Sequence, residues 1–325
     1  MPELWFERLN RRTGLPRWAG AVCFGAGPFI LLAFPIAALY GDPIVLGSTA
    51  IALVVSYFTF YTTRYLRRVI VNLGEYTNEM SDEPAGWPEA LELSHFASLR
   101  RILGVWVIQL VLVVPLFLFG APGSLVANFI SEIPFLWFNF VLGTFFWTFG
   151  FSMYSIYKMG NMPLKLKPYT QDKTLGLKRF ASASLNFTLI YFMVVTSVVV
   201  PILFGGAIPF ELALVFLTFY PLGLLLFLFP LRSLHAKLVE AKAKELAWLE
   251  PRATAVLKRL KSEEGNQIGQ DIVNELTAID KIERDISSIR TWPFDTGIIV
   301  RLSAIIFSLV AIMGAKILQI AVGIK

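Results

Sequence analysis

The sequence has few of the residues from which most metal and redox sites are built. Its 325 residues include one cysteine, Cys23, and two histidines, His95 and His235. A single cysteine excludes an intramolecular disulfide, and its place in an apolar run argues against a redox or thiolate-metal role. Two histidines are too few for a histidine-rich metal site. We therefore expect neither a bound metal nor a cofactor.

Charged residues are also scarce, at 16% of the chain, whereas soluble domains contain roughly a quarter. Hydrophobic residues make up 56% and aromatic residues 14%. A soluble protein of this composition would carry apolar surface that it could not bury. The sequence also lacks a phosphate-binding glycine loop and the HExxH, CxxC and GxSxG motifs. The composition predicts an integral membrane protein, and we expect no enzymatic activity.

Seven hydrophobic runs are long enough, at about 18 residues or more, to cross a hydrocarbon layer of ~30 Å as helices. Helices are expected because the backbone finds no water to bond inside lipid. The predicted fold class is therefore an all-α polytopic membrane protein with seven transmembrane helices. The runs are Trp18–Tyr40, Ile44–Thr62, Leu103–Gly120, Ile133–Tyr157, Ala181–Phe204, Leu212–Leu231 and Gly297–Val322.

The basic residues alternate between the two sides of these runs. Arginine and lysine precede the first run and fill every second connection, whereas residues 41–43, 121–132 and 205–211 contain none. By the positive-inside rule, this pattern places the N-terminus in the cytoplasm and the C-terminus outside. The same pattern explains the net charge of +6, because the basic residues face the anionic inner surface of the bilayer, and no nucleic-acid partner is needed to explain it. We expect a multi-pass protein of the plasma membrane.

Residues 232–290 form the longest polar connection and divide the chain into three parts. Residues 1–231 are the predicted six-helix bundle, 232–290 a cytoplasmic helical hairpin, and 291–325 the seventh helix. Apolar residues spaced three and four apart occur in both halves of the hairpin, with a turn signal at 262–267. The seam either closes one hairpin on itself or packs in part against neighbouring subunits. Its residues in the second half include Ile272, Ile279, Ile282, Ile286 and Ile289.

The seventh run follows a helix break at Trp292–Gly297 and is the only run with basic residues toward both ends. Arg301 and Lys316 either extend to opposite membrane surfaces while small residues allow close helix packing, or the helix lines a pore. In the second interpretation polar residues contact water and Ile312 narrows the path. The candidate pore-lining residues are Arg301, Ser308, Ile312, Ala315 and Gln319.

Other polar residues near the runs leave further interpretations open. The acidic residues on the outer side are Asp42, Glu132 and Glu211. They are either solvated helix caps and loop residues, or they form an acidic vestibule that concentrates cations. The fourth and fifth runs carry hydroxyl and amide side chains. These side chains either form hydrogen bonds to neighbouring helices or, together with the seventh run, form the site of a small-molecule transporter. A membrane scaffold or sensor acting through the hairpin is a third interpretation. These polar residues are Thr144, Thr148, Ser152, Asn186, Thr188 and Tyr191.

Seven spans of this orientation, short outer loops, a long helical connection before the last span and a split last helix together resemble one family. The chain is similar in architecture to the seven-transmembrane ion channel superfamily that includes insect odorant and gustatory receptors. The resemblance implies a homotetrameric ion channel. Residues 232–290 would be its cytoplasmic anchor and residues 297–322 the helix that lines a shared pore. The insect signature of the last span is absent, with Gln319 the nearest feature, and a chemoreceptor role does not follow.

Overall fold

The computed structural model describes the chain from residue 3 to residue 294 with five gaps, followed by part of the C-terminal segment. The described residues are 3–40, 43–81, 91–120, 125–205, 210–262 and 270–294, and then 297, 300, 303, 304, 306–308, 310, 311, 314, 315 and 318. Their regular secondary structure is helical throughout, without a strand in any of these ranges. The predicted all-α class is confirmed.

The helices differ widely in length. The N-terminal region consists of α1 (Trp5–Thr13), α2 (Arg17–Gly20), the π-helical segment η1 (Ala21–Ala26) and α3 (Gly27–Tyr40). The middle of the chain forms α4 (Pro43–Glu79), the 3-10 helix η2 (Leu93–Ala97), α6 (Leu99–Gly120) and α7 (Leu125–Asn161). The C-terminal region contains α8 (Lys178–Gly205), α9 (Phe210–Ser262) and α10 (Gln270–Ser287).

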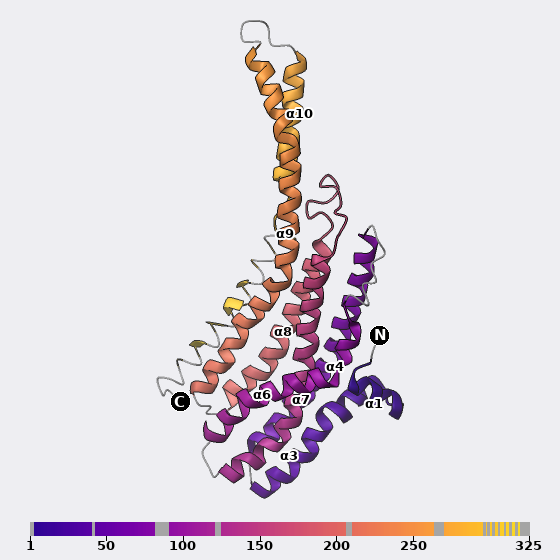
Figure 1. Cartoon of the computed structure of the whole chain (residues 1–325). Coiled ribbons are helices and arrows are strands. Elements are labelled where there is room, and N and C mark those ends of the chain that lie inside the picture. Colours follow the sequence, from indigo (N-terminus) through magenta and orange to yellow (C-terminus); the bar gives the residue numbers. More distant parts are fainter. Residues whose placement is uncertain are drawn as a thin grey trace.

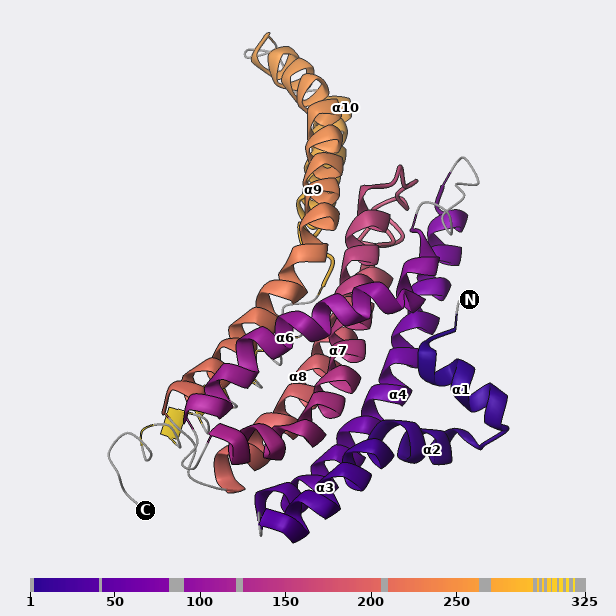
Figure 2. The same cartoon turned by 60° about the horizontal axis from the view of Figure 1, so that its bottom comes forward.

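Helix α7 lies at the centre of the bundle and packs against α3, α4, α6, α8 and α9 (Figure 2). The aromatic side chains of Phe145, Phe149, Phe187 and Tyr191 are almost completely buried around it. The rings of Phe149 and Tyr191 lie 4.9 Å apart between their centroids. Aromatic rings bury large apolar areas, and their pairing adds to that gain, so this cluster fixes α7 against α8.

The outside of the bundle is apolar as well. Leu31 of α3, Val111 of α6 and Leu225 of α9 are 76%, 68% and 64% exposed. Such side chains favour hydrocarbon over water. Four helical stretches within the described residues are long and apolar enough to cross a membrane: Arg17–Ile36, Glu132–Asn161, Lys178–Val199 and Thr218–Ser262. The chain is therefore a helical protein with several helices suited to a membrane.

These four stretches correspond to the first, fourth, fifth and sixth predicted spans. The second span falls in α4, the third in α6 and the seventh in residues 297–322, and part of each lies outside the residues whose side chains are described. The number of seven spans and their orientation therefore stay predictions.

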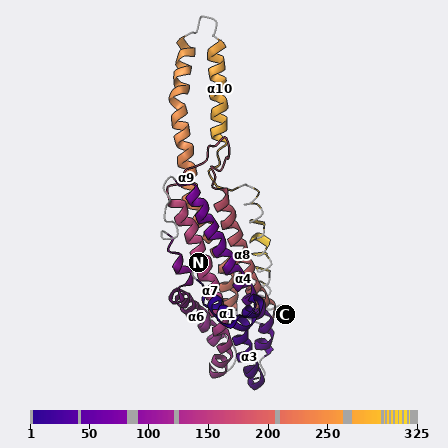
Figure 3. The ribbon, with the colours of Figure 1, turned by 90° about the vertical axis from the view of Figure 1, so that its right-hand side faces the viewer.

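Helices α4 and α9 run far beyond their hydrophobic stretches. Helix α9 has 53 residues, or about 80 Å at ~1.5 Å per residue, and continues through Pro221, Pro230 and Pro251. The end of the sixth run at Leu231 is thus not a helix end, and Pro251 does not interrupt α9. With α10, the distal part of α9 forms an antiparallel hairpin that projects from the bundle (Figures 1 and 3). The end of α4 and the connection between α7 and α8 lie on the same side (Figure 1).

Candidate functional site

The seam of the hairpin is buried within one chain. Ile272, Ile286 and Ile289 are at most 6% exposed. Ile279 and Ile282 are half-buried and pack against the apolar cluster that contains Leu238 and Leu249 of α9. The isoleucine side chains of α10 and Ile289, which follows it, therefore serve the contact between the two arms, where they remove apolar area from water.

Apolar side chains also lie on the outer faces of the hairpin. Leu246, Trp248 and Leu257 of α9 and Val273 of α10 are between 39% and 48% exposed. Arg252 covers the Trp248 ring at 4.0 Å from its centroid. At ~100° per residue, Leu246 and Leu257 lie on one side of α9 and Trp248 lies on the other. These large apolar side chains of the hairpin are open to contact with another molecule.

The hairpin ends at a junction formed by Thr291, Trp292, Pro293 and Phe294, none of which is helical. His235 of α9 holds this junction in two ways. Its Nδ1 lies 2.6 Å from the carbonyl oxygen of Thr291, which can only accept, so this nitrogen carries the proton. Its ring stacks on Trp292 with 4.2 Å between centroids. The predicted break before the last helix is confirmed at this junction.

Lysines of α9 bind the backbone around the junction. Lys242 Nζ donates to the carbonyl oxygens of Ser287 at 2.7 Å and Ile289 at 3.3 Å. These carbonyls lie at the C-terminal end of α10, where helix carbonyls lack partners and a positive charge is favourable. Lys237 Nζ donates to the carbonyl oxygen of Met162 at the end of α7. These two lysines therefore connect α9 to the end of α10 and to the end of α7.

The α7–α8 connection, residues 162–177, reaches the same place. The backbone N–H of Arg290 donates to the carbonyl oxygen of Lys173 at 3.1 Å, and the Tyr76 hydroxyl donates to Gly176 at 2.9 Å. Gly176 has φ +90°, a left-handed conformation that glycine adopts without strain. This connection links the end of α4 with the junction.

Asp172 organises the α7–α8 connection. Its carboxylate accepts hydrogen bonds from the backbone N–H and the hydroxyl of Thr174, at 2.8 and 2.7 Å, and from the N–H of Gly176 at 3.0 Å. Burial acts to raise the pKa of Asp172, but these bonds and the nearby Lys167 outweigh it and hold the pKa below its ordinary value. The ionised carboxylate therefore stabilises the turn.

Replacing Asp172 by alanine is expected to lower the free energy of unfolding by about 2 kcal/mol, because three bonds to a charged acceptor are lost. Trypsin should cleave faster after Lys173. Since the folded pKa is lowered, the wild-type contribution is present above the ordinary pKa near 3.8 and disappears as pH falls through the folded value. Thermal unfolding in detergent at pH 7 and at decreasing pH measures both effects. Glu283→Ala, an exposed carboxylate on α10, is the matched control, and equal losses in the two variants would refute the role of Asp172.

The described part of the last helix lies at one edge of the bundle (Figures 1 and 3). Ile306 packs against the main core, but Val300, Phe307 and Leu318 are 66%, 74% and 65% exposed. At ~100° per residue, four small side chains share a sector of about 60°. They are exposed, and we call them the small-residue face: Ala304, Ser308, Ala311 and Ala315.

Two of the five candidate pore residues, Ser308 and Ala315, thus lie together on the small-residue face. The Ser308 hydroxyl donates to the carbonyl oxygen of Ala304 at 2.8 Å, which keeps it on its own helix. Arg301, Ile312 and Gln319 lie outside the described residues.

The three candidate vestibule acids have different positions. Glu132 lies inside α7, which begins at Leu125, so the helix starts before the predicted run, and the stretch of α7 suited to a membrane begins at Glu132. Glu132 is half-buried and makes a polar contact. Glu211 is the second residue of α9, and its side chain is outside the described part. Asp42 is also outside the described residues. Helices α7 and α9 begin before the fourth and sixth hydrophobic runs, because a helix continues wherever its backbone bonds continue, whatever the side chains.

The hydroxyls considered for a transporter site are mostly buried between helices. Thr144, Thr148 and Ser152 of α7 and Thr188 of α8 are fully buried. Each donates to the carbonyl four residues earlier in its own helix, at 2.7 to 3.1 Å. Asn186, by contrast, is exposed. These donors are already satisfied, so the hydroxyls support helix packing.

Sequence reasoning missed the contacts that hold the N-terminus to the bundle. Arg67 of α4 is 6% exposed and donates to Glu7 of α1 at 2.7 Å. The Trp5 indole N–H donates to the Thr144 hydroxyl at 3.0 Å. Arg67 and Glu7 are 60 positions apart in the sequence, and Thr144 and Trp5 are 139 positions apart. The available signal was the spacing of Trp5, Phe6 and Leu9, which share one side of a helix at ~100° per residue and are followed or separated by charged residues.

Within the described residues, no cluster of three or more histidine, cysteine, aspartate or glutamate side chains could hold a metal ion. No protein-family model, curated protein or solved structure matches this chain. The junction, the hairpin and the last helix therefore have to be interpreted from their own geometry.

Proposed function

We propose that the protein is an oligomeric ion channel of the plasma membrane in which the last helix of each subunit lines a shared path. The observation that carries this proposal is the exposure of the small-residue face at the edge of the subunit. Polar and small side chains in a membrane helix usually face other helices or water. Within its own chain this face has no such partner among the described residues. A pore at the centre of several subunits supplies both neighbours and water.

The hairpin supports assembly in this proposal. Its seam is used within the chain, but Leu246 and Leu257 remain exposed on one side of α9 and Trp248 on the other. Apolar residues that remain exposed outside the membrane favour contact with another protein surface. In a ring of identical hairpins, each hairpin has a neighbour on either side, and these two contacts would bury the side chains and anchor the last helices.

The junction then transmits movement between the two parts. His235 contacts Thr291 and Trp292, so the hairpin and the first residues before the last helix are held together by stacking and a hydrogen bond. A displacement of the hairpin therefore acts directly on the last helix. The resemblance to the seven-transmembrane ion channel superfamily supports the same arrangement, with four subunits, a cytoplasmic anchor and a pore formed by the last helix.

Cysteine accessibility tests the path. In a Cys23→Ser background, which removes the single, exposed native thiol, Ser308→Cys and Ala315→Cys are expected to react with a charged, water-soluble thiol reagent. Thiols react as thiolates, which form in water and not in lipid. The reagent should reduce ion flux in liposomes several-fold for both variants.

Val310→Cys is the matched control, since position 310 points to the opposite side of the helix at ~100° per residue. Flux through this variant should be unaffected by the reagent. Three results would contradict the proposal: equal inhibition of all three variants, no ion flux from folded protein in liposomes, or a monomeric mass in lipid.

A further inference from the structure

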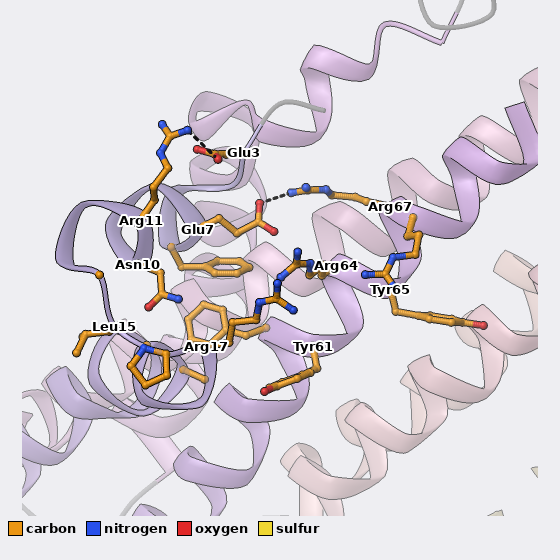
Figure 4. A pocket seen from close by; sticks show the side chains of 17 residues that line it. Glu3, Glu7, Asn10, Arg11, Leu15, Arg17, Tyr61, Arg64, Tyr65 and Arg67 are labelled. Carbon is orange, nitrogen blue, oxygen red and sulfur yellow. Dashed lines mark hydrogen bonds and ion pairs between the residues drawn. The ribbon is translucent and has the colours of Figure 1, made fainter. Parts of the chain in front are cut away.

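A cavity of about 960 Å³ lies between the N-terminal helices and α4. Its walls come from α1, the turn Gly14–Pro16, α2, and residues 60–68 of α4. Figure 4 shows Arg17 and Arg64 extending into this hollow from its two sides. The lining is strongly basic, with five arginines against two carboxylates, which leaves three positive charges in excess. The arginines are Arg11, Arg17, Arg64, Arg67 and Arg68, and the carboxylates are Glu3 and Glu7.

Both carboxylates are already neutralised. Glu3 pairs with Arg11 at 3.0 Å, and Glu7 pairs with Arg67 at 2.7 Å. Arg17, Arg64 and Arg68 have no carboxylate within ion-pair distance in the described part of the chain. Like charges gathered without a counter-charge repel one another. This arrangement is favourable once an anion enters the cavity.

The cavity also contains an unsatisfied polar group. The Asn10 side-chain oxygen is buried and has no hydrogen-bond partner. Asn10 is held against Gly20, where an added Cβ would lie 1.9 Å from that oxygen. An amide oxygen only accepts hydrogen bonds, so the donors that the cavity offers an anion come from its arginines and not from this oxygen. Arginine guanidinium groups suit phosphate because their N–H groups form paired bonds to its oxygens.

The location indicates where the phosphate comes from. Helix α2 begins the first stretch suited to cross a membrane, Arg17–Ile36. Around the cavity, Trp18, Tyr61 and Tyr65 are 62%, 41% and 40% exposed, and such amphipathic rings favour the boundary between lipid and water. The floor is formed in part by buried Phe6 and Phe60. A lipid headgroup presents phosphate at this depth together with apolar chains.

We infer that this cavity binds the phosphate-bearing headgroup of an anionic membrane lipid, with Arg17, Arg64 and Arg68 as its main contacts. The bound headgroup connects α2 to α4, because Arg17 belongs to α2 and Arg64 and Arg68 belong to α4. This site is separate from the last helix and does not depend on ion conduction.

Native mass spectrometry of the full-length protein in detergent tests the inference with phosphatidylglycerol, phosphatidylcholine and inorganic phosphate as probes. The wild type should retain phosphatidylglycerol in preference to phosphatidylcholine. Arg17→Gln/Arg64→Gln should bind phosphatidylglycerol at least about tenfold more weakly, because each charge-assisted contact contributes a factor of this order. Arg12→Gln/Arg100→Gln removes the same charge from exposed positions that do not line the cavity and should bind like the wild type.

Three outcomes would overturn the inference. They are equal weakening in both double variants, no preference for phosphatidylglycerol, and inorganic phosphate that displaces the lipid completely at low concentration, which would identify a site for free anions. If Arg17→Gln/Arg64→Gln does not fold, Arg17→Lys/Arg64→Lys keeps the charge while losing the paired geometry. It should bind the lipid several-fold more weakly than the wild type, and unchanged binding would count against the arginine contacts.

Discussion

Glu7→Ala is expected to lower the free energy of unfolding by about 3–5 kcal/mol, because it leaves the Arg67 guanidinium buried without its partner. The side chains of Arg67 and Glu7 are 7% and 18% exposed in this pair. Glu7 also accepts the backbone N–H of Leu4 at 2.9 Å. One substitution therefore removes both the ion pair and a bond that begins α1.

A double-mutant cycle with Arg67→Met separates the pair from the other contacts of Glu7. Glu7→Ala/Arg67→Met should be less destabilised than the sum of the single variants, because no charge then remains buried without a partner. Chemical unfolding in detergent measures the free energies. Trypsin cleavage after Arg8, Arg11 and Arg12 reports whether α1 separates from the bundle first.

Glu3→Ala is the matched control. Its partner Arg11 is 73% exposed, so loss of this pair should cost at most about 1 kcal/mol. A cost of the same size for Glu3→Ala and Glu7→Ala, or additive single variants in the cycle, would show that burial of the Arg67 pair is not the cause.

Gly223→Leu is expected to force α8 and α9 apart. A Cβ at position 223 would lie 2.5 Å from Cε1 of Tyr191 and 2.9 Å from Cε1 of Phe192. Both rings are almost completely buried, so they cannot move aside. The Tyr191 hydroxyl also donates to the carbonyl oxygen of Phe219 at 2.9 Å, and separation of the helices would break this bond.

Overpacking of a close-packed core costs typically ~1–3 kcal/mol, and the lost hydrogen bond adds about 1 kcal/mol. We therefore expect Gly223→Leu to unfold at a lower temperature and to be recovered in smaller amounts. Gly104→Leu on α6 is the control, since no atom lies within 4 Å of its Cβ position and leucine favours helix more than glycine. Similar stability of the two variants would contradict the close contact between α8 and α9.

Several elements were predictable because their signals are local. The break at Thr291–Phe294 was indicated by Pro293, whose ring disfavours a continuing helix, although three prolines lie within α9 without ending it. The hairpin follows from apolar residues spaced three and four apart in its two arms. By contrast, the continuity of α9 past Leu231 was not predictable from hydropathy. Leu231 marks a change in the surroundings of the helix, whereas the backbone bonds of α9 run on to Ser262.

The candidate site was predictable only in part. Helical spacing alone placed Ser308 and Ala315 on one face, and the structure adds that this face is exposed. Helical spacing did not predict the contact of His235 with Thr291, which is 56 positions away, and it did not predict the basic cavity. Such contacts depend on which helices lie side by side, and no spacing within one helix encodes that.

The sequence by itself determined that the chain is helical and apolar, where its polar hairpin lies and where the last helix is interrupted. Composition, periodicity and proline act within a few residues, so they can be read along the chain. Only the tertiary structure decided that Arg67 neutralises Glu7, while Arg17 and Arg64 have no carboxylate partner among the described residues and the side-chain oxygen of Asn10 lacks a donor. The energy of a charge depends on its distance to others in space, and the fold alone sets that distance.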